Sequence, residues 1–103
     1  MAKVHRTYYS TGELQSEVFV INGKKNGEEK WYYENGQLNV ICTYIDGKKN
    51  GERKSYHLYG QLWRSIIYKD DKVNGEYKEY NENGDLIEQS IWMNGKKIED
   101  YNV

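Results

Sequence analysis

The chain has 103 residues and a formal net charge of −1, so it has room for one compact domain and no general attraction to nucleic acid or membrane. Aliphatic side chains are few, but 11 Tyr and 3 Trp supply apolar area, and Tyr suits a thin, half-exposed structure. Cys42 is the single cysteine, which excludes an intramolecular disulfide.

A unit of 24 residues recurs four times along the chain without insertion or deletion. The positions that recur are Tyr8, Tyr32, Tyr56 and Tyr80, then Gly12, Gly36, Gly60 and Gly84, then Leu14, Leu38, Leu62 and Leu86, then Lys24, Lys48, Lys72 and Lys96. Such a period indicates a repeat architecture, in which each unit buries its apolar side chains against its neighbours. We therefore predict one domain over residues 1–103, with a leading strand in residues 1–7 and units at about 8–31, 32–55, 56–79 and 80–103.

Each unit is predicted to form two strands joined by turns. In the second unit the strands cover residues 28–33 and 38–45, and the turns cover residues 34–36 and 46–51. Asn-Gly pairs flanked by aromatic and β-branched residues are a strong hairpin signal, and the chain contains no Pro to block a central strand. A three-residue loop with Gly36 in the left-handed conformation would place Tyr32 opposite Leu38. The sequence predicts an all-β fold, an elongated, twisted antiparallel meander of eight or nine strands, roughly 40 Å across at ~4.8 Å per strand.

Strand parity predicts which side chains are buried together. We expect the recurring apolar positions to gather on one face, and they are Tyr8, Leu14, Val18, Val20, Tyr32, Leu38, Cys42, Tyr44, Tyr56, Leu62, Ile66, Tyr68, Tyr80, Leu86 and Trp92. The opposite face would then be exposed to solvent.

Two runs of sequence carry a resemblance to a known family. The first is Tyr-Tyr-x-Asn-Gly-x-Leu at residues 32–38, and the second is Gly-Lys-Lys-Asn-Gly-Glu at residues 47–52. These units resemble the short MORN-repeat variants of bacterial and some viral proteins over about residues 4–101. The third unit departs from the pattern at Asp70-Asp71 and at Leu58-Tyr59. The resemblance implies an elongated sheet of hairpins that acts as an interaction module or scaffold. It also implies links to phospholipid membranes in some members and antitoxin-like roles in some bacterial ones.

No motif in the chain indicates catalysis. The run from Gly23 to Gly27 lacks the residue order of a phosphate-binding loop. His5 and His57 have no Cys or carboxylate at ligand spacing, so we expect surface or packing roles for them and no metal site. Cys42 lies in an apolar column, which favours a buried, inert thiol over a nucleophile. We expect no cofactor and no enzymatic activity.

Two surfaces are candidates for binding. One end of the sheet should collect lysines that could meet an anionic lipid, although lysine in turns also serves solubility; they are Lys24, Lys25, Lys48, Lys49, Lys72, Lys96 and Lys97. Strand twist of about 40–50° per repeat would make this row spiral. The other surface is the exposed face where the repeats differ and where Trp, Tyr and Arg, common in binding hot spots, occur. Its candidate residues are Trp31, Tyr33, Arg53, His57, Tyr59, Trp63 and Tyr77; these aromatic side chains could instead be structural.

The expected function is a non-enzymatic protein-interaction or scaffold module that binds its partner on this aromatic face. The alternatives are an antitoxin or immunity-type inhibitor and a phospholipid-associating adaptor that uses the lysine turns. Nucleic acid is not an expected partner. Open edges at residues 4–9 and 98–103 suggest a monomer or weak homodimer. The chain lacks an apolar leader, a long apolar stretch and an Asn-x-Ser/Thr site, so we expect an intracellular, cytoplasmic protein.

Overall fold

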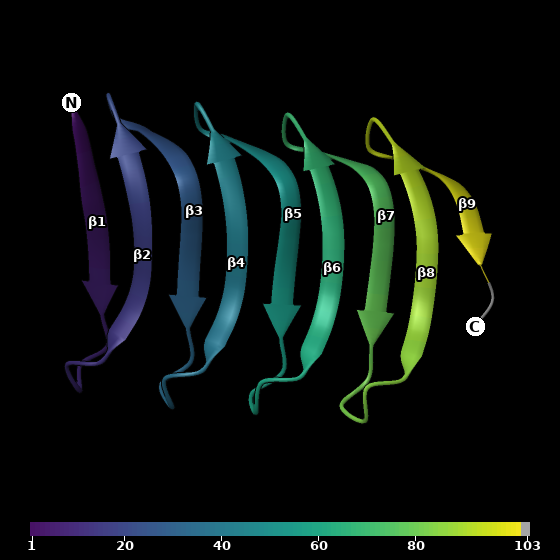
Figure 1. Ribbon diagram of the computed structural model, residues 1–103, viewed down its shortest axis with the longest axis horizontal. Coiled ribbons are helices and arrows are strands. Elements are labelled where there is room, and N and C mark those ends of the chain that lie inside the picture. The colour runs from purple at the N-terminus through teal and green to yellow at the C-terminus, as the bar shows by residue number, and fades with distance from the viewer. Residues whose placement is uncertain (102–103) are drawn as a thin grey trace.

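The computed structural model describes residues 1–101, which form nine strands in one open sheet (Figure 1). The strands follow one another in chain order, and each is antiparallel to the next. They are β1 (Ala2–Tyr8), β2 (Leu14–Ile21), β3 (Lys24–Tyr32), β4 (Leu38–Ile45), β5 (Lys48–Tyr56), β6 (Leu62–Lys69), β7 (Lys72–Tyr80), β8 (Leu86–Met93) and β9 (Lys96–Tyr101). The predicted all-β meander is confirmed. Of the predicted last edge, residues 102 and 103 lie outside the described part. Residues 1–101 include no helix long and apolar enough to cross a membrane.

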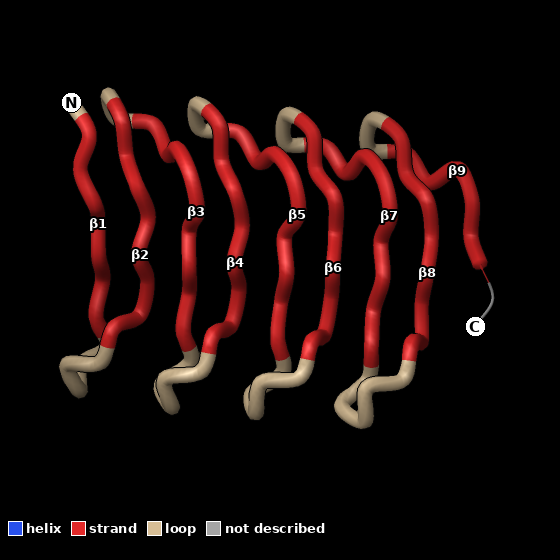
Figure 2. The backbone as a smooth tube through the Cα atoms, viewed as in Figure 1, coloured by secondary structure: helices blue, strands red, loops and turns tan. Residues whose placement is uncertain are grey.

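The two ends of the sheet carry different connections (Figure 2). One, the loop end, has five-residue loops between β1 and β2, β3 and β4, β5 and β6, and β7 and β8. In the second loop the backbone N–H of Tyr33 donates to the carbonyl oxygen of Gln37 over 2.8 Å, and Gly36 has φ of 88°. Tyr32 consequently pairs with Leu38. The predicted left-handed Gly36 and the pairing of Tyr32 with Leu38 are confirmed, but the connection has five residues, one more on each side than the predicted three-residue loop.

The other end, the turn end, has two-residue turns that are shorter than predicted. Asp46 and Gly47 both have positive φ, as a type I′ turn requires, and β5 begins at the next residue. The prediction of one turn over residues 46–51 is wrong, because Asn50 and Gly51 lie inside β5 at a bulge. The side chain of Asn50 accepts a hydrogen bond from the backbone N–H of Asp70 over 3.1 Å. Asn50 therefore holds the next turn instead of forming one.

A second bulge decides which side chains share a face. Trp31 pairs with Val40 and Tyr32 pairs with Leu38, which leaves Asn39 as an extra residue in β4. An extra residue shifts the alternation of side chains, so Leu38 and Cys42 point to opposite faces. The same shift recurs at the equivalent residues, Gln15, Trp63 and Ile87. The prediction of one shared buried face is therefore wrong.

The two faces can be named by their central residues. The Cys42 face carries a column of buried side chains at 24-residue spacing, with exposed fractions of 7, 4, 7 and 1%, respectively, for Val18, Cys42, Ile66 and Ser90. The Tyr32 face carries the tyrosine and leucine columns, namely Tyr8, Tyr32, Tyr56, Tyr80, Leu14, Leu38, Leu62 and Leu86. Tyr8, predicted to be buried, is 58% exposed. The deepest packing thus lies on the Cys42 face.

The sheet is flatter than its strand number led us to expect. The Cα atoms extend over 43 × 31 × 14 Å, and the long dimension agrees with the predicted width. A rotation of about 40–50° per repeat would tilt the edge strands far out of the central plane. The 14 Å dimension is too small for that, so the predicted spiral is wrong. Flat sheets of many strands are unusual and need added stabilisation, and hydrogen bonds between side chains and the backbone of the next repeat are present at both ends of this sheet.

Candidate functional site

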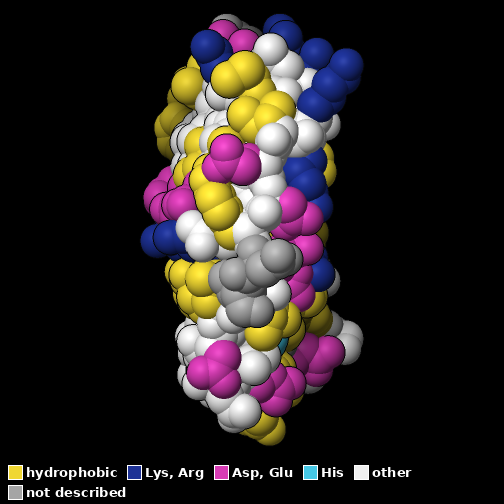
Figure 3. All heavy atoms as spheres, turned by 90° about the vertical axis from the view of Figure 1, so that its right-hand side faces the viewer, with side chains coloured by type: hydrophobic (Ala, Val, Ile, Leu, Met, Phe, Trp, Pro, Cys, Tyr) yellow, Lys and Arg dark blue, Asp and Glu magenta, His cyan; other side chains and the backbone are white. Residues whose placement is uncertain are grey.

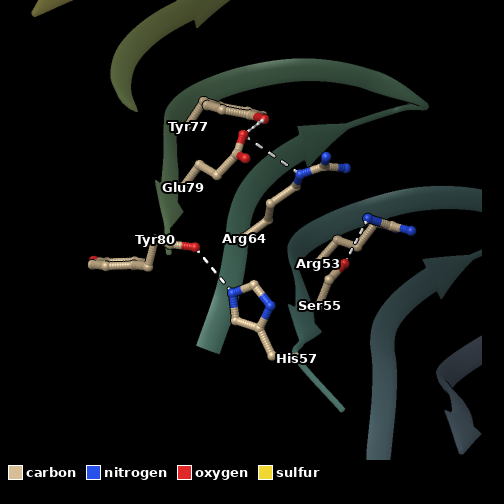
Figure 4. A network of polar contacts seen from close by, with 7 residues as sticks. All are labelled: Arg53, Ser55, His57, Arg64, Tyr77, Glu79 and Tyr80. Carbon is tan, nitrogen blue, oxygen red and sulfur yellow. Dashed lines mark hydrogen bonds and ion pairs between the residues drawn. The ribbon is translucent and has the colours of Figure 1, made fainter. Parts of the chain in front are cut away.

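Two of the residues predicted to contact a partner, Tyr33 and His57, form hydrogen bonds between successive repeats. The hydroxyl of Tyr33 donates to the carbonyl oxygen of Tyr56 over 2.6 Å. One repeat later, Nε2 of His57 lies 3.0 Å from the carbonyl oxygen of Tyr80 and donates to it when it carries the proton (Figure 4). Tyr33 and His57 therefore direct their polar atoms along the loop end, toward the next hairpin.

Three other predicted contact residues lie on the Cys42 face. Trp31, in β3, is 37% exposed. Arg53, in β5, pairs in register with Cys42 on one side and Ile66 on the other, and Tyr77, in β7, pairs with Ile66. Cross-strand partners in a sheet share a face. The structure thus brings Trp31, Arg53 and Tyr77 onto one surface that crosses three repeats.

Trp63 is the extra residue of the bulge in β6, and this changes the orientation expected for its neighbour. Simple strand alternation would point Arg64 to the face opposite Trp63, but its guanidinium carbon lies 4.0 Å from the Trp63 ring centroid. Nε of Arg64 also lies 3.6 Å from a carboxylate oxygen of Glu79 (Figure 4). Arg64 and Trp63 are in contact because the bulge shifts the alternation. Tyr59, by contrast, is 78% exposed at the tip of the loop after β5.

The hydroxyl of Tyr77 extends the polar network on this face. It donates to a carboxylate oxygen of Glu79 over 3.0 Å (Figure 4). Burial, followed by this hydrogen bond, raises the pKa of Tyr77 to about 12. Arg64 and Tyr77 therefore share the Glu79 carboxylate, which leaves its negative charge compensated.

A shallow groove of about 320 Å³ crosses the Cys42 face over β3, β4 and β5. Trp31, Val40 and Tyr44 supply apolar and aromatic surface, while Lys49 and Arg53 supply positive charge. The groove therefore combines aromatic walls with two cations, a pairing suited to an anionic group beside an apolar one.

The thiol of Cys42 is poorly placed to react in this groove. Cys42 lines it but is only 4% exposed, and burial raises the pKa of its thiol. A thiol that resists ionisation is a weak nucleophile. Among residues 1–101, no three His, Cys, Asp or Glu side chains gather in a way that could hold a metal ion.

Several residues of this face escaped the sequence-based prediction. Glu29 is 7% exposed, and one of its carboxylate oxygens lies 2.7 Å from Nζ of Lys25. The same Nζ lies 5.0 Å from the ring centroid of Tyr44. Lys49 repeats the arrangement over Tyr68, at 5.1 Å. The oppositely charged residues at positions 25 and 29 were a signal for the ion pair, but the predicted turn at this end of the sheet left Lys25 outside the strand that contains Glu29.

The predicted lysine cluster is divided between the two faces. Lys25 and Lys49 lie against aromatic rings on the Cys42 face, and so does Lys97, whose Nζ is 5.8 Å from the ring centroid of Trp92. The first residue of each strand after a turn points to the Tyr32 face instead. These residues form an exposed row of Lys24, Lys48, Lys72 and Lys96. Basic side chains gather at the turn end, toward the top of Figure 3. The two lysines of one turn therefore do not share a surface.

These features define a class of protein. It is a β-hairpin repeat module whose successive repeats are joined by hydrogen bonds at both ends of a flat sheet. The chain belongs to the MORN repeat variant family, which it matches over residues 3–22, 25–46, 49–70 and 73–94. The last three segments begin 24 residues apart, as the sequence period requires. A search of curated proteins and a search of solved structures each found no match.

Proposed function

We propose that this chain is a non-enzymatic protein-binding module that holds its partner on the Cys42 face. The observation that carries the proposal is the contrast between two neighbouring columns of the repeat. On the Cys42 face one column reads His5, Glu29, Arg53 and Tyr77, four residues of different chemistry. The next column, on the Tyr32 face, reads Arg6, Lys30, Lys54 and Lys78 and keeps one charge.

This contrast has a physical reason. Columns that the fold requires stay alike between copies, because each copy makes the same contacts with its neighbours. A partner without a 24-residue period would instead meet a different side chain in each repeat. Marked divergence in exposed columns of one face is therefore what a binding surface predicts, although one column of the Tyr32 face also differs between copies, namely Glu17, Ile41, Ser65 and Gln89.

The Tyr32 face has the features of a solvated surface around Lys54 and Lys78. Lys54 lies 3.4 Å from Glu52, and Lys78 lies 3.3 Å from Glu76, in the same arrangement one repeat apart. Exposed ion pairs of this kind contribute about 0–1 kcal/mol each, so their main effect is solubility. We therefore assign partner recognition to the opposite face.

The experiment is affinity capture of partners with wild type and two folded variants. Trp31→Ala/Arg53→Glu changes the Cys42 face, and Lys54→Glu/Lys78→Glu changes the Tyr32 face. We expect a protein that wild type and the Tyr32-face variant both retain and the Cys42-face variant loses. Equal capture by all three forms would contradict the proposal. A captured toxin enzyme that the chain inhibits would narrow the function to that of an antitoxin.

A second candidate function is association with anionic phospholipid. It is supported by the exposed row of Lys24, Lys48, Lys72 and Lys96, which the flat sheet keeps on one face of the turn end. Each lysine near an anionic bilayer contributes about 1 kcal/mol at moderate ionic strength. Co-sedimentation with phosphatidylserine vesicles at low salt, lost in Lys24→Glu/Lys48→Glu, would support it. The absence of co-sedimentation at low salt would contradict it.

A further inference from the structure

We propose that the groove on the Cys42 face binds a carboxylate side chain from an extended acidic segment of the partner protein, held between Lys49 and Arg53. This inference rests on the proposed function, because it names the chemistry that the same face recognises. Two successive repeats differ at identical positions of the fold.

The first of these repeats contains its own carboxylate. Nζ of Lys25 lies 2.7 Å from Oε2 of Glu29 and 5.0 Å from the ring centroid of Tyr44. Glu29 is 7% exposed, so its carboxylate is largely withdrawn from solvent, whereas the Lys25 side chain is 42% exposed. The position is therefore one at which this fold accommodates a carboxylate beside a lysine that lies over an aromatic ring.

In the next repeat the lysine and the ring remain, but the carboxylate is replaced. Lys49 lies 5.1 Å from the centroid of Tyr68, as Lys25 does over Tyr44, while Arg53 occupies the position of Glu29. Within residues 1–101, neither Lys49 nor Arg53 takes part in an ion pair. Two cations thus line the groove at a place where the preceding repeat has one cation and one anion.

Arg53 is held by Ser55 in a way that leaves donors for a ligand. One η nitrogen of Arg53 donates to Oγ of Ser55 over 3.1 Å (Figure 4). A guanidinium group has five N–H donors and matches a carboxylate with two of them at once. The bond to Ser55 restrains the side chain, so less conformational entropy is lost when a carboxylate binds.

The other repeats lack this combination. The equivalent residues are Val73 and Tyr77 in one repeat and Lys97 and Tyr101 in the last, so neither pair has two cations. The cationic site is therefore specific to the repeat that begins at β5, and not a general property of the fold.

The groove favours a single carboxylate in a peptide over a polyanion. Glu29 also lines the groove, and its negative charge would repel a continuous row of phosphates. Trp31 and Val40 line the same groove and offer apolar contact beside the two cations. In an extended segment alternate side chains face the same side, so an acidic residue and an apolar residue two positions away can enter together.

The test uses two synthetic peptides and the full chain. The probe is Ac-Thr-Glu-Thr-Phe-Thr-NH2, and its matched control replaces Glu with Gln. In ¹⁵N NMR titrations we expect the Glu peptide to shift the indole N–H of Trp31 and the Nε–H of Arg53. Since a hydrogen-bonded charge pair is lost, the Gln peptide should bind at least about tenfold more weakly.

The protein variants separate the groove from total charge. Arg53→Glu should restore the ion pair seen one repeat earlier, with Lys49 as its partner, and weaken peptide binding by about tenfold or more. Lys48→Glu changes the net charge equally on the Tyr32 face and should leave the affinity within about twofold. If Arg53→Glu does not fold, Arg53→Gln should show the same loss.

Several results would overturn the inference. They are equal binding of the Glu and Gln peptides, equal binding by wild type and the Arg53 variants, or tighter binding of a thymidine oligonucleotide through the same two cations. Capture of a partner that depends on Trp31 but not on Arg53 would leave the proposed function standing and overturn the carboxylate site. If peptide binding requires Arg53 but partner capture is unaffected by changes on the Cys42 face, the carboxylate site stands and the proposed function is overturned.

Discussion

The hydroxyl group of Tyr33 donates a hydrogen bond over 2.6 Å to the backbone carbonyl oxygen of Tyr56, which lies 23 residues further along the chain. Tyr9 makes the same bond to the carbonyl oxygen of Tyr32. Each hairpin is thus attached to the next by a side chain as well as by strand pairing. Because an open sheet of hairpins has little deep core, such contacts between neighbours hold successive repeats in a fixed orientation.

Replacing Tyr33 with Phe should lower the free energy of unfolding by about 1 kcal/mol, the usual contribution of one hydrogen bond. Urea denaturation followed by circular dichroism measures the change. Tyr59→Phe is the matched control, because that side chain is 78% exposed and should change stability by less than about 0.5 kcal/mol. Equal effects of the two substitutions would contradict the role assigned to Tyr33.

The bulges in β5 and β7 can be compared through equivalent glycines. Gly51 has φ of 88° with nothing within 4 Å of an added Cβ, whereas Gly75 has φ of 133° and would place a Cβ 3.0 Å from Cβ of Ile67. Gly51→Ala should cost about 1–2 kcal/mol from backbone strain alone. Gly75→Ala should cost more, because the steric clash adds to the strain. Denaturation midpoints in the opposite order would contradict the difference in packing.

The bulge at Asn39 and its equivalents also predicts an order of stability effects. Ile66 is 7% exposed on the Cys42 face, whereas Leu62 is half-buried on the Tyr32 face. Ile66→Ala should therefore cost about 2–3 kcal/mol, and Leu62→Ala should cost less. Thermal and urea denaturation of both variants measure the order. A larger loss of stability in Leu62→Ala than in Ile66→Ala would show that the main packing lies on the Tyr32 face.

Two tyrosines should make the fold sensitive to alkali. Burial, followed by the charge of Glu29, raises the pKa of Tyr44 from 10.0 to about 12, and burial, followed by the hydrogen bond to Glu79, raises that of Tyr77 to about 12. Because the neutral form is favoured in the folded state, this stabilisation is complete below pH 10 and is lost as the pH rises towards 12.

The measurement is the free energy of unfolding from about pH 8 to about pH 12, together with tyrosinate absorbance. In Tyr44→Phe or Tyr77→Phe the decline should be shallower, and one late-titrating tyrosine should disappear. Tyr59→Phe serves as the exposed control and should leave the decline unchanged. A decline of equal slope in wild type and both buried-site variants would contradict the assignment.

The local features of the fold could be predicted because they depend on residues near each other in sequence. The period of 24 is explicit in the chain, and the Asn-Gly pair before Gln37 correctly places Tyr32 opposite Leu38. The Asn-Gly pair at residue 50 misled the prediction, because a positive φ at Gly51 suits a bulge as well as a turn. The Asn-Gly pair alone does not distinguish a bulge from a turn.

The faces and the flatness could not be predicted for physical reasons. The extra residue of the repeated bulge is Gln15, Asn39, Trp63 or Ile87, two amides, an indole and an aliphatic side chain with no property common to all four, so no local signal marks it. The contacts that limit the twist join residues 20 to 23 positions apart. For the candidate site, the divergence between repeats indicated Trp31, Arg53 and Tyr77, but Glu29 and Tyr44 required the register of the sheet.

The most direct test of the central claim compares two aromatic residues that are adjacent in β3 and point to opposite faces. Affinity for the captured partner should be measured by titration calorimetry for wild type, Trp31→Ala and Tyr32→Ala, after folding is verified. We predict that Trp31→Ala weakens binding by about 30-fold, as truncation of a hot-spot residue does, and that Tyr32→Ala lowers stability while affinity stays within about twofold. An affinity that falls in Tyr32→Ala and is unchanged in Trp31→Ala would contradict the assignment of the Cys42 face.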